Sequence, residues 1–225
     1  MADTSRFPKL KFCGLTRAED VLAAIEIGAD AIGLNFFKSS PRYVTPVRAA
    51  ELSCLAVGLT MRVGVFVNAS PREVAEVLAS CPLDCVQLHG DETPLWLEDA
   101  QGLESLRSVK FIRAISWRGL EEDSRNLFAW TQTPIPNLLG FLVDAHDPVQ
   151  RGGTGKTARW DLLHPRPPEF GGLPFLLAGG LTHENLLQAI QTARPDGLDI
   201  ASGIESAPGI KDLSKMRAIA KLLAS

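Results

Sequence analysis

The chain has 225 residues with a formal net charge of −3, and 45% of them are hydrophobic, which suits a globular protein with a large core. No block of Lys and Arg provides a nucleic-acid footprint, and no apolar run approaches the ~20 residues of a membrane-spanning helix. The first residues, MADTSRFPKLKF, lack the apolar centre of a signal peptide, so we expect a cytoplasmic protein.

Short apolar or β-branched segments recur along the whole chain and predict strands. In chain order they span residues 9–13, 30–35, 62–67, 85–89, 109–114, 139–144, 174–179 and 197–202. Runs of this length and composition are typical of parallel strands that are covered on both faces.

Amphipathic segments between these strands predict helices. They span residues 18–28, 47–58, 71–80, 183–193 and 213–224. Thr16 and Glu19 have the spacing of a capping box at the start of the first helix, and Gly28 is placed to end it. Ser70 and Thr182 predict the starts of two later helices.

Strands and helices alternate without a break in composition, which predicts repeated βαβ units and an α/β fold. Such units form either an open doubly wound sheet or a barrel. A repeat number of about eight favours a single (β/α)8 TIM barrel domain over residues 1–225. Residues 145–170 interrupt the alternation, and we expect one long loop there with a short helix near 159–164.

Reactive and polar side chains collect at the C-terminal ends of the predicted strands, where TIM barrels place their active sites. The candidates are Cys13, Arg42, Asn68, His89, Asp144, Gly179, Gly180, Asp199, Ser202 and Gly203. The opposite strand ends carry no comparable set. This asymmetry indicates an enzyme.

Glycines follow the seventh and eighth predicted strands, at Gly179-Gly180 and at Gly203 beside Ser202. Glycine lets backbone N–H groups approach an anion closely, and these two loops form the usual phosphate site of TIM barrels. Ordinary turn glycines are the alternative. The presence of both loops favours a phosphate-binding barrel whose ligand is a phosphorylated small molecule.

The segment from Gly152 to Thr157 is similar to a P-loop, but Gln150 stands where that motif needs its first glycine. We predict instead a loop that closes over the active site. Gly153 is our candidate for substrate contact there, and Lys156 is placed to meet substrate charge.

The four cysteines match neither CxxC nor a zinc pattern, and the four histidines form no ligand cluster, so neither set indicates a metal site. Free cysteine behaves as a small buried hydrophobe, and we expect that structural role for Cys54, Cys81 and Cys85. Cys13 differs because it ends a central strand.

Cys13 and Asp144 are the candidate catalytic pair. Lys11 lies two residues before Cys13, hence on the same side of the strand, and offers a route to the thiolate. Asp144 ends an otherwise apolar strand, where partial burial would keep its carboxyl protonated as an acid. A helix cap or salt-bridge partner is the alternative role for Asp144. A thiolate base opposite a carboxylic acid suits proton transfer in a sugar isomerisation.

These residues and the segments around them resemble phosphoribosylanthranilate isomerase of tryptophan biosynthesis. The matching segments are 11–16, 28–33, 40–44, 63–68, 86–90, 142–144, 152–157, 179–181 with 184–185, and 199–205 with 208–209. They follow one another in order over nearly the whole chain.

The resemblance implies an Amadori rearrangement of N-(5-phosphoribosyl)anthranilate to 1-(2-carboxyphenylamino)-1-deoxyribulose 5-phosphate, without cofactor or metal. It implies that Asp144 protonates the furanose ring oxygen and that Cys13 removes the C2′ proton. Arg42 matches the position that holds the anthranilate carboxylate, and Asp199 a position near the ribose hydroxyls. The residues that match the phosphate cradle are Gly179, Gly180, Ser202 and Gly203. His89 either touches the substrate or braces the end of the fourth strand.

Two positions depart from the family pattern. Ala145 stands where a small hydroxyl residue is more usual, and Ala201 where a serine often stands. The second change removes one side-chain contact and leaves the backbone amide. Neither change affects the proposed acid or base.

Three alternatives remain. Indole-3-glycerol-phosphate synthase would use lysine and glutamate at its strand ends, and Cys13-Gly14 disfavours it. A pentose-phosphate epimerase would need metal ligands, which the histidines do not supply. A non-catalytic barrel that senses a phosphorylated metabolite would tolerate loss of the acid or the base, and both are present. The sequence indicates no obligate protein partner.

Overall fold

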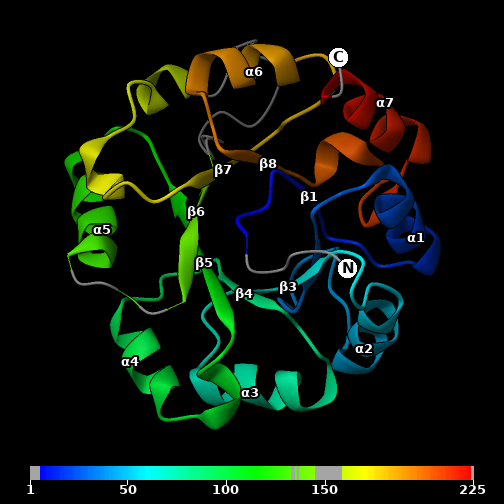
Figure 1. Ribbon diagram of the computed structural model, residues 1–225, viewed down its shortest axis with the longest axis horizontal. Coiled ribbons are helices and arrows are strands. Elements are labelled where there is room, and N and C mark those ends of the chain that lie inside the picture. Colours follow the sequence, from blue (N-terminus) through cyan, green and yellow to red (C-terminus); the bar gives the residue numbers. More distant parts are fainter. Residues whose placement is uncertain (1–5, 133–134, 136, 145–158, 224–225) are drawn as a thin grey trace.

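Eight parallel strands close into a barrel in the computed structural model, which describes residues 6–132, 135, 137–144 and 159–223 (Figure 1). The strands are β1 (Leu10–Cys13), β2 (Ala31–Asn35), β3 (Met61–Phe66), β4 (Cys85–Leu88), β5 (Lys110–Ser116), β6 (Leu138–Asp144), β7 (Phe175–Ala178) and β8 (Gly197–Ile200). Each strand pairs with the next one along the chain, and β8 pairs with β1. The predicted TIM barrel is therefore confirmed.

Helices surround the barrel on its outside (Figure 1). They are α1 (Ala18–Ile27), α2 (Pro46–Leu55), α3 (Pro71–Ser80), α4 (Leu95–Gln101), α5 (Glu121–Thr131), α6 (Leu186–Ala193) and α7 (Leu213–Leu223). In the part of the chain that the structure describes, the 3-10 turns are η1 (Glu104–Leu106), η3 (Trp160–Leu163), η4 (Pro168–Phe170) and η5 (Ser202–Ile204). Within the described ranges, no helix is long and apolar enough to cross a membrane.

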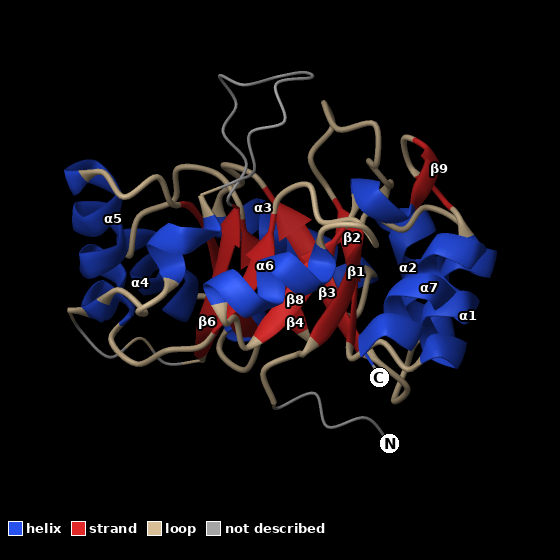
Figure 2. Cartoon of the chain, turned by 90° about the horizontal axis from the view of Figure 1, so that it is seen from above, coloured by secondary structure: helices blue, strands red, loops and turns tan. Residues whose placement is uncertain are grey.

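A short antiparallel hairpin follows β8 and η5. It consists of β9 (Glu205–Ala207) and β10 (Ile210–Lys211) and leads into α7. Figure 2 shows the barrel from the side, with β9 beyond the strand ends. The short helix expected near 159–164 is η3, between β6 and β7.

Local sequence signals set two of the helix boundaries as predicted. Ser70 and Glu73 form the capping box of α3, where the Ser70 Oγ atom accepts from the Glu73 amide at 3.3 Å. The Glu73 carboxylate accepts from the Ser70 amide at 2.7 Å in return. Gly28 ends α1 in the left-handed conformation, at φ 84°. Residues other than glycine rarely adopt this conformation.

The predicted caps at Thr16 and Thr182 are wrong. Helix α1 has Arg17 at its N-cap, and the Thr16 hydroxyl donates instead to the Gly209 carbonyl at 2.6 Å. Helix α6 begins after Asn185, whose Oδ1 atom accepts from the Thr182 amide at 2.8 Å. The Thr16 hydroxyl thus bonds to a loop distant in sequence rather than to the first turn of α1.

Buried apolar side chains form two layers, because successive residues of a barrel strand point to opposite sides. The outer layer lies between the strands and the helices and includes Phe12, Ile32, Phe141 and Phe175. The inner layer fills the barrel with Ala31, Met61, Val63, Cys85, Ile112, Ala114, Leu142, Leu176 and Ala178. Asp144 lies two residues beyond Leu142 and shares its inward face. The inner layer therefore forms the floor under the C-terminal strand ends.

Two of the three cysteines expected to be buried are buried. Cys85 belongs to the inner layer, and Cys81 is buried at the end of α3. The expectation for Cys54 is wrong, because this residue is exposed on α2.

Candidate active site

A pocket of about 420 Å³ opens at the C-terminal ends of the strands. We call it the mouth pocket. Its lining residues are Cys13, Asn35, Phe37, Ser40, Arg42, Val65, Val67, His89, Asp144, Ala178, Gly179, Gly180, Leu181, Asp199, Ala201 and Ser202. Most of the residues that the sequence singles out thus lie around one cavity, although what each of them does stays a prediction.

Three candidates are not among the lining residues. Asn68 lines a second pocket instead, which His89 and Asp144 also line. Gly203 packs against the loop after β7, where an added Cβ atom would overlap the Leu181 carbonyl oxygen. Gly153 belongs to the predicted closing loop, and it lies outside the described residues together with Lys156 and Ala145.

Cys13 lies buried at the end of β1, facing Gly33 of β2 across the strand pair. A Cβ atom at Gly33 would lie 2.7 Å from the Cys13 Sγ atom and 3.2 Å from the Lys11 Nζ atom. Contacts this short would force one of the groups to move. The glycine thus leaves room for both functional groups inside the barrel.

Lys11 is fully buried, and its Nζ atom lies 2.7 Å from the Asp199 Oδ1 atom. Burial opposes protonation of Lys11, but Asp199 outweighs it and raises the pKa of the ammonium. Lysine and aspartate therefore form an ion pair, and Asp199 of this pair lines the mouth pocket. A pair of opposite charges inside a protein is stable only with such close contact.

The pKa of Cys13 depends on burial and on the charges around the thiol. Burial raises the pKa of the Cys13 thiol, and the charge of Asp199 raises it further. Lys11 and Lys211 act in the opposite direction without reversing the shift. Lys11 thus favours the thiolate, as predicted, but the net shift in the pKa of Cys13 is upward, because burial and Asp199 together outweigh both lysines.

Asp144 ends β6 and is partly exposed to the pocket. Strands β7 and β8 separate β6 from β1 in the closed barrel. Asp144 and Cys13 therefore approach the cavity from different sides. A substrate between them would have one face toward a thiol and another toward a carboxyl group.

His89 follows β4 and also lines the pocket. Its Nδ1 atom lies 2.7 Å from the Nε2 atom of buried Gln87. With the Gln87 amide as donor, Nδ1 accepts and the His89 Nε2 atom carries the proton. Burial lowers the pKa of His89 and favours this neutral form.

The loop after β7 has a backbone conformation that favours glycine. Gly179 and Gly180 have φ values of 91° and 63°, which only glycine adopts readily. The Asn185 side chain donates to the Gly180 carbonyl at 2.9 Å and steadies this loop. Ser202 adds a hydroxyl from the second loop. The two loops form a polar corner of the mouth pocket.

Arg42 enters the pocket from the loop after β2, and its guanidinium pairs with Glu205. Glu205 was not predicted as a site residue, although it also follows β8. The apolar lining from Phe37, Val65 and Val67 was missed as well. The signal for it was available, because Val65 and Val67 lie at the C-terminal end of the third predicted strand.

Comparisons with known proteins agree with one another. Residues 10–222 match the family model described as N-(5′phosphoribosyl)anthranilate (PRA) isomerase. The N-(5′-phosphoribosyl)anthranilate isomerase of Trichlorobacter lovleyi is 41% identical over 93% of this chain and 94% of its own length. That of Trichormus variabilis is 39% identical over 96% and 99%.

Solved structures extend the similarity. The phosphoribosyl anthranilate isomerase of Thermotoga maritima has a TM-score of 0.80 at 33% identity, covering 96% of this chain and 98% of its own. A second structure of such an isomerase, in complex with reduced 1-(o-carboxyphenylamino)-1-deoxyribulose 5-phosphate, has a TM-score of 0.77 at 31% identity. It covers 96% of this chain and 97% of its own.

Proposed function

Because the chain belongs to the N-(5′-phosphoribosyl)anthranilate isomerase family, we propose that its mouth pocket isomerises N-(5′-phosphoribosyl)anthranilate with Cys13 as general base and Asp144 as general acid. The reaction is the aldose–ketose isomerisation of tryptophan biosynthesis. The observation that carries the residue assignment is that a thiol and a carboxyl group line one pocket from different strands.

The first step opens the furanose ring. Asp144 gives its proton to the ring oxygen, and the bond between that oxygen and C1′ breaks with its electron pair going to oxygen. The lone pair of the anthranilate nitrogen forms the C1′=N bond of a Schiff base. A general acid positioned within hydrogen-bond reach contributes ~100- to 10,000-fold to such a step.

The second step moves a proton from C2′. The Cys13 thiolate takes this proton, the C–H electron pair forms a C1′=C2′ bond, and the C1′=N electron pair returns to nitrogen. The resulting enol then gains a proton at C1′ and loses one from its hydroxyl, which gives the ketose. Protons only change places, so the step needs no external oxidant or reductant.

The raised pKa of Cys13 fits this order of events. A mostly protonated thiol is a weak base toward an ordinary C–H group. Ring opening places a positive C1′=N group beside C2′ and acidifies its proton, so a small thiolate fraction of high basicity is sufficient. The thiol acts as a base here and forms no bond to carbon.

We assign each part of the substrate to other candidate residues in or beside the pocket. We assign the phosphate to Gly179, Gly180, Ser202 and Gly203, and the ribose hydroxyls to Asp199. The apolar wall of Phe37, Val65 and Val67 accommodates the aromatic ring. Arg42 then meets the anthranilate carboxylate through charge-assisted hydrogen bonds.

Two further proposals accompany this assignment. We assign the protein to the cytoplasm, because its reaction belongs to amino-acid biosynthesis. Its ligand is a phosphorylated small molecule, in keeping with the analogue held by the isomerase of the solved complex. Indole-3-glycerol-phosphate synthase, the closest alternative from sequence, has no support in the family match.

Complementation tests the proposal directly. A tryptophan auxotroph that lacks this isomerase is transformed with the wild-type chain and with its Cys13→Ser and Asp144→Asn variants. We expect growth without tryptophan for the wild type alone. Purified wild-type protein that folds but neither supports growth nor consumes N-(5′-phosphoribosyl)anthranilate would contradict the activity. Growth of either variant at the wild-type rate would contradict the residue assignment.

A further inference from the structure

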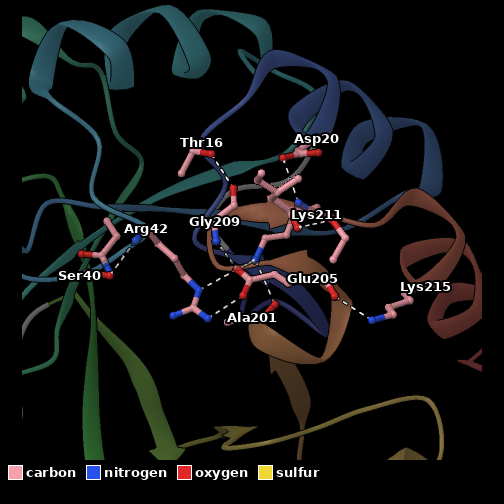
Figure 3. A network of polar contacts seen from close by, with 12 residues as sticks. Thr16, Asp20, Ser40, Arg42, Ala201, Glu205, Gly209, Lys211 and Lys215 are labelled. Carbon is pink, nitrogen blue, oxygen red and sulfur yellow. Dashed lines mark hydrogen bonds and ion pairs between the residues drawn. The ribbon is translucent and has the colours of Figure 1, made fainter.

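The guanidinium of Arg42 is held on one edge by Glu205. The Arg42 Nε atom donates to Glu205 Oε1 at 2.7 Å, and Nη2 donates to Oε2 at 2.7 Å (Figure 3). Two parallel bonds of this kind fix both the position and the plane of the guanidinium. Among the described residues, Nη1 makes no hydrogen bond. The edge formed by Nη1 and Nη2 therefore remains available.

Glu205 is itself anchored at the start of β9. Its Oε1 atom also accepts from the Lys211 Nζ atom at 2.9 Å and from the Gly209 amide at 3.2 Å. Its carbonyl oxygen accepts from the Lys215 Nζ atom at 2.7 Å. The Glu205 side chain is only 6% exposed, against 23% for Arg42. The Glu205 carboxylate is thus held in place by several contacts, and it in turn holds the more exposed Arg42 guanidinium.

The charges of this cluster leave Arg42 attractive to an anion. Burial opposes ionisation of Glu205, but hydrogen bonds from Arg42 and Lys211 outweigh it and lower the pKa of the carboxyl. Lys211 balances the negative charge of Glu205 at the far side. Arg42, Glu205 and Lys211 together carry one net positive charge, and Arg42 is the member of this group that lines the pocket.

The aliphatic part of the Arg42 side chain packs against Gly14. It crosses Gly14, the neighbour of Cys13, so closely that a Cβ atom there would overlap the Arg42 Cδ atom. The Arg42 amide donates to the Ser40 Oγ atom at 3.1 Å, as Figure 3 shows. Backbone, stem and guanidinium are therefore each held by a separate contact.

We propose that Glu205 is a positioning residue for substrate recognition: it occupies the Nε–Nη2 edge of Arg42, so that the Nη1–Nη2 edge receives the anthranilate carboxylate. This inference rests on the proposed function. An unpaired arginine offers a carboxylate two bidentate edges and many rotamers. With one edge occupied, a planar carboxylate has a single bidentate mode, which orients the attached ring and its nitrogen.

Binding of two ligands tests this role. One is reduced 1-(o-carboxyphenylamino)-1-deoxyribulose 5-phosphate, and the other is the same molecule without its carboxyl group. Calorimetry gives the Kd of each ligand for the wild type and for Glu205→Gln. We expect the variant to bind the carboxylated ligand about tenfold more weakly, since a charge-assisted pair loses its fixed partner. The Kd of the descarboxy ligand should stay at its wild-type value.

A matched control exists at the other end of the barrel. Arg62 and Asp84 form the same side-on pair, with Nε–Oδ2 and Nη2–Oδ1 distances of 2.8 and 2.6 Å. Neither residue lines the mouth pocket. The Asp84→Asn variant should therefore leave both Kd values unchanged, which separates a general loss of rigidity from the specific loss of Arg42 orientation.

Loss of the Glu205 charge leaves Lys211 buried without its carboxylate, which destabilises the fold. The double variant Glu205→Gln with Lys211→Met removes both charges and serves where the single variant does not fold. It should show the same selective weakening. Steady-state kinetics should show a higher KM and a nearly unchanged kcat.

The possible results distinguish failure of the proposed function from failure of the role inferred for Glu205. Wild-type protein that does not isomerise N-(5′-phosphoribosyl)anthranilate would overturn the proposed function. If the wild type is active, equal weakening of both ligands by Glu205→Gln would make Glu205 a structural residue of the pocket. Unchanged binding of both ligands would show that Arg42 needs no positioning. Either result would overturn this inference and leave the activity intact.

Discussion

The two ends of the barrel use acidic side chains in different ways. At the N-terminal end, Asp30, Asp84 and Asp196 each stand directly before an even-numbered strand. Each accepts a backbone N–H at the start of the preceding odd-numbered strand. The distances are 2.9 Å for Asp30 Oδ2 and Leu10 N, 2.8 Å for Asp84 Oδ2 and Arg62 N, and 2.8 Å for Asp196 Oδ2 and Phe175 N.

The acidic side chains at the mouth have other partners. Asp199 and Glu205 pair with side chains, Lys11 in one case and Arg42 with Lys211 in the other. Asp144 and Asp199 line the pocket directly. A carboxylate that satisfies a strand's N–H group stabilises the barrel, whereas one that arranges side chains around a cavity serves recognition and chemistry. Substitutions at the two ends should therefore separate stability from activity.

The largest expected effect is loss of turnover at the mouth. Cys13→Ser and Asp144→Asn should each lower kcat by about 1,000-fold, the usual contribution of a general base or acid. Binding of the reduced product analogue should change little, because neither group is assigned to hold it. Steady-state assays and calorimetry measure the two quantities. Wild-type turnover in either variant would remove that residue from the mechanism.

The next effect concerns substrate binding. Arg42→Ala should raise KM by roughly 10- to 100-fold, the value of a charge-assisted hydrogen-bond pair, with a smaller change in kcat. Glu205 keeps its contact with Lys211 in this variant, so the fold should persist. An unchanged KM would show that the carboxylate binds elsewhere.

At the other end of the barrel the expected effect is on stability. Asp84→Asn should lower the free energy of unfolding by about 2 kcal/mol, since a charged acceptor of both a guanidinium and a backbone N–H is lost. Urea unfolding measures this, and kcat and KM should stay at wild-type values. A variant of wild-type stability but reduced turnover would reverse the contrast between the ends.

The smallest expected effect is a change in the pKa of the Cys13 thiol in the mouth pocket. Because burial and Asp199 raise the pKa of Cys13, its thiolate should appear only above the ordinary thiol pKa of ~8.5. Asp199→Asn removes one of these causes and should move the midpoint to lower pH. Thiolate absorbance measures it in a Cys54→Ser background, with Cys13→Ser subtracted. A midpoint below ~8.5 in the parent protein would contradict the assigned environment.

Linkage gives the sign of the matching stability change. A thiol whose pKa is higher in the folded state binds its proton more tightly there. It therefore stabilises the fold below the pKa of the unfolded thiol, and this contribution is lost as pH rises through the folded value. Cys13→Ser should flatten the alkaline part of the stability curve.

Sequence patterns located the strands well because apolar runs of four to eight residues are a local signal. The helix over 71–80 was predicted with its observed bounds, since Ser70 and Glu73 mark its start. Helices α4 and α5 were not predicted. The stretch of α5 begins with three acidic residues and buries few side chains, so its apolar period is weak.

Most of the site residues could be predicted from the same local signals, together with the rule that TIM barrels place their active sites at the C-terminal strand ends. Parallel strands of a barrel all end at the same rim, so residues such as Cys13, His89 and Asp144 had to meet. Their ionic partners did not follow. Arg42 was assigned to substrate alone, and its contact with Glu205 joins positions 163 residues apart.

The sequence by itself thus determined the order of the strands, a barrel as the favoured architecture and most of the reactive side chains of the mouth pocket, because each depends on periodicity and on strand direction. Only the tertiary structure decided how those side chains are paired. Closure of β8 onto β1 brings Asp199 to Lys11, and burial together with the charge of Asp199 raises the pKa of Cys13. The hairpin after β8 brings Glu205 to Arg42. Ion pairs form between groups that are close in space, and these groups come close only when the barrel has closed.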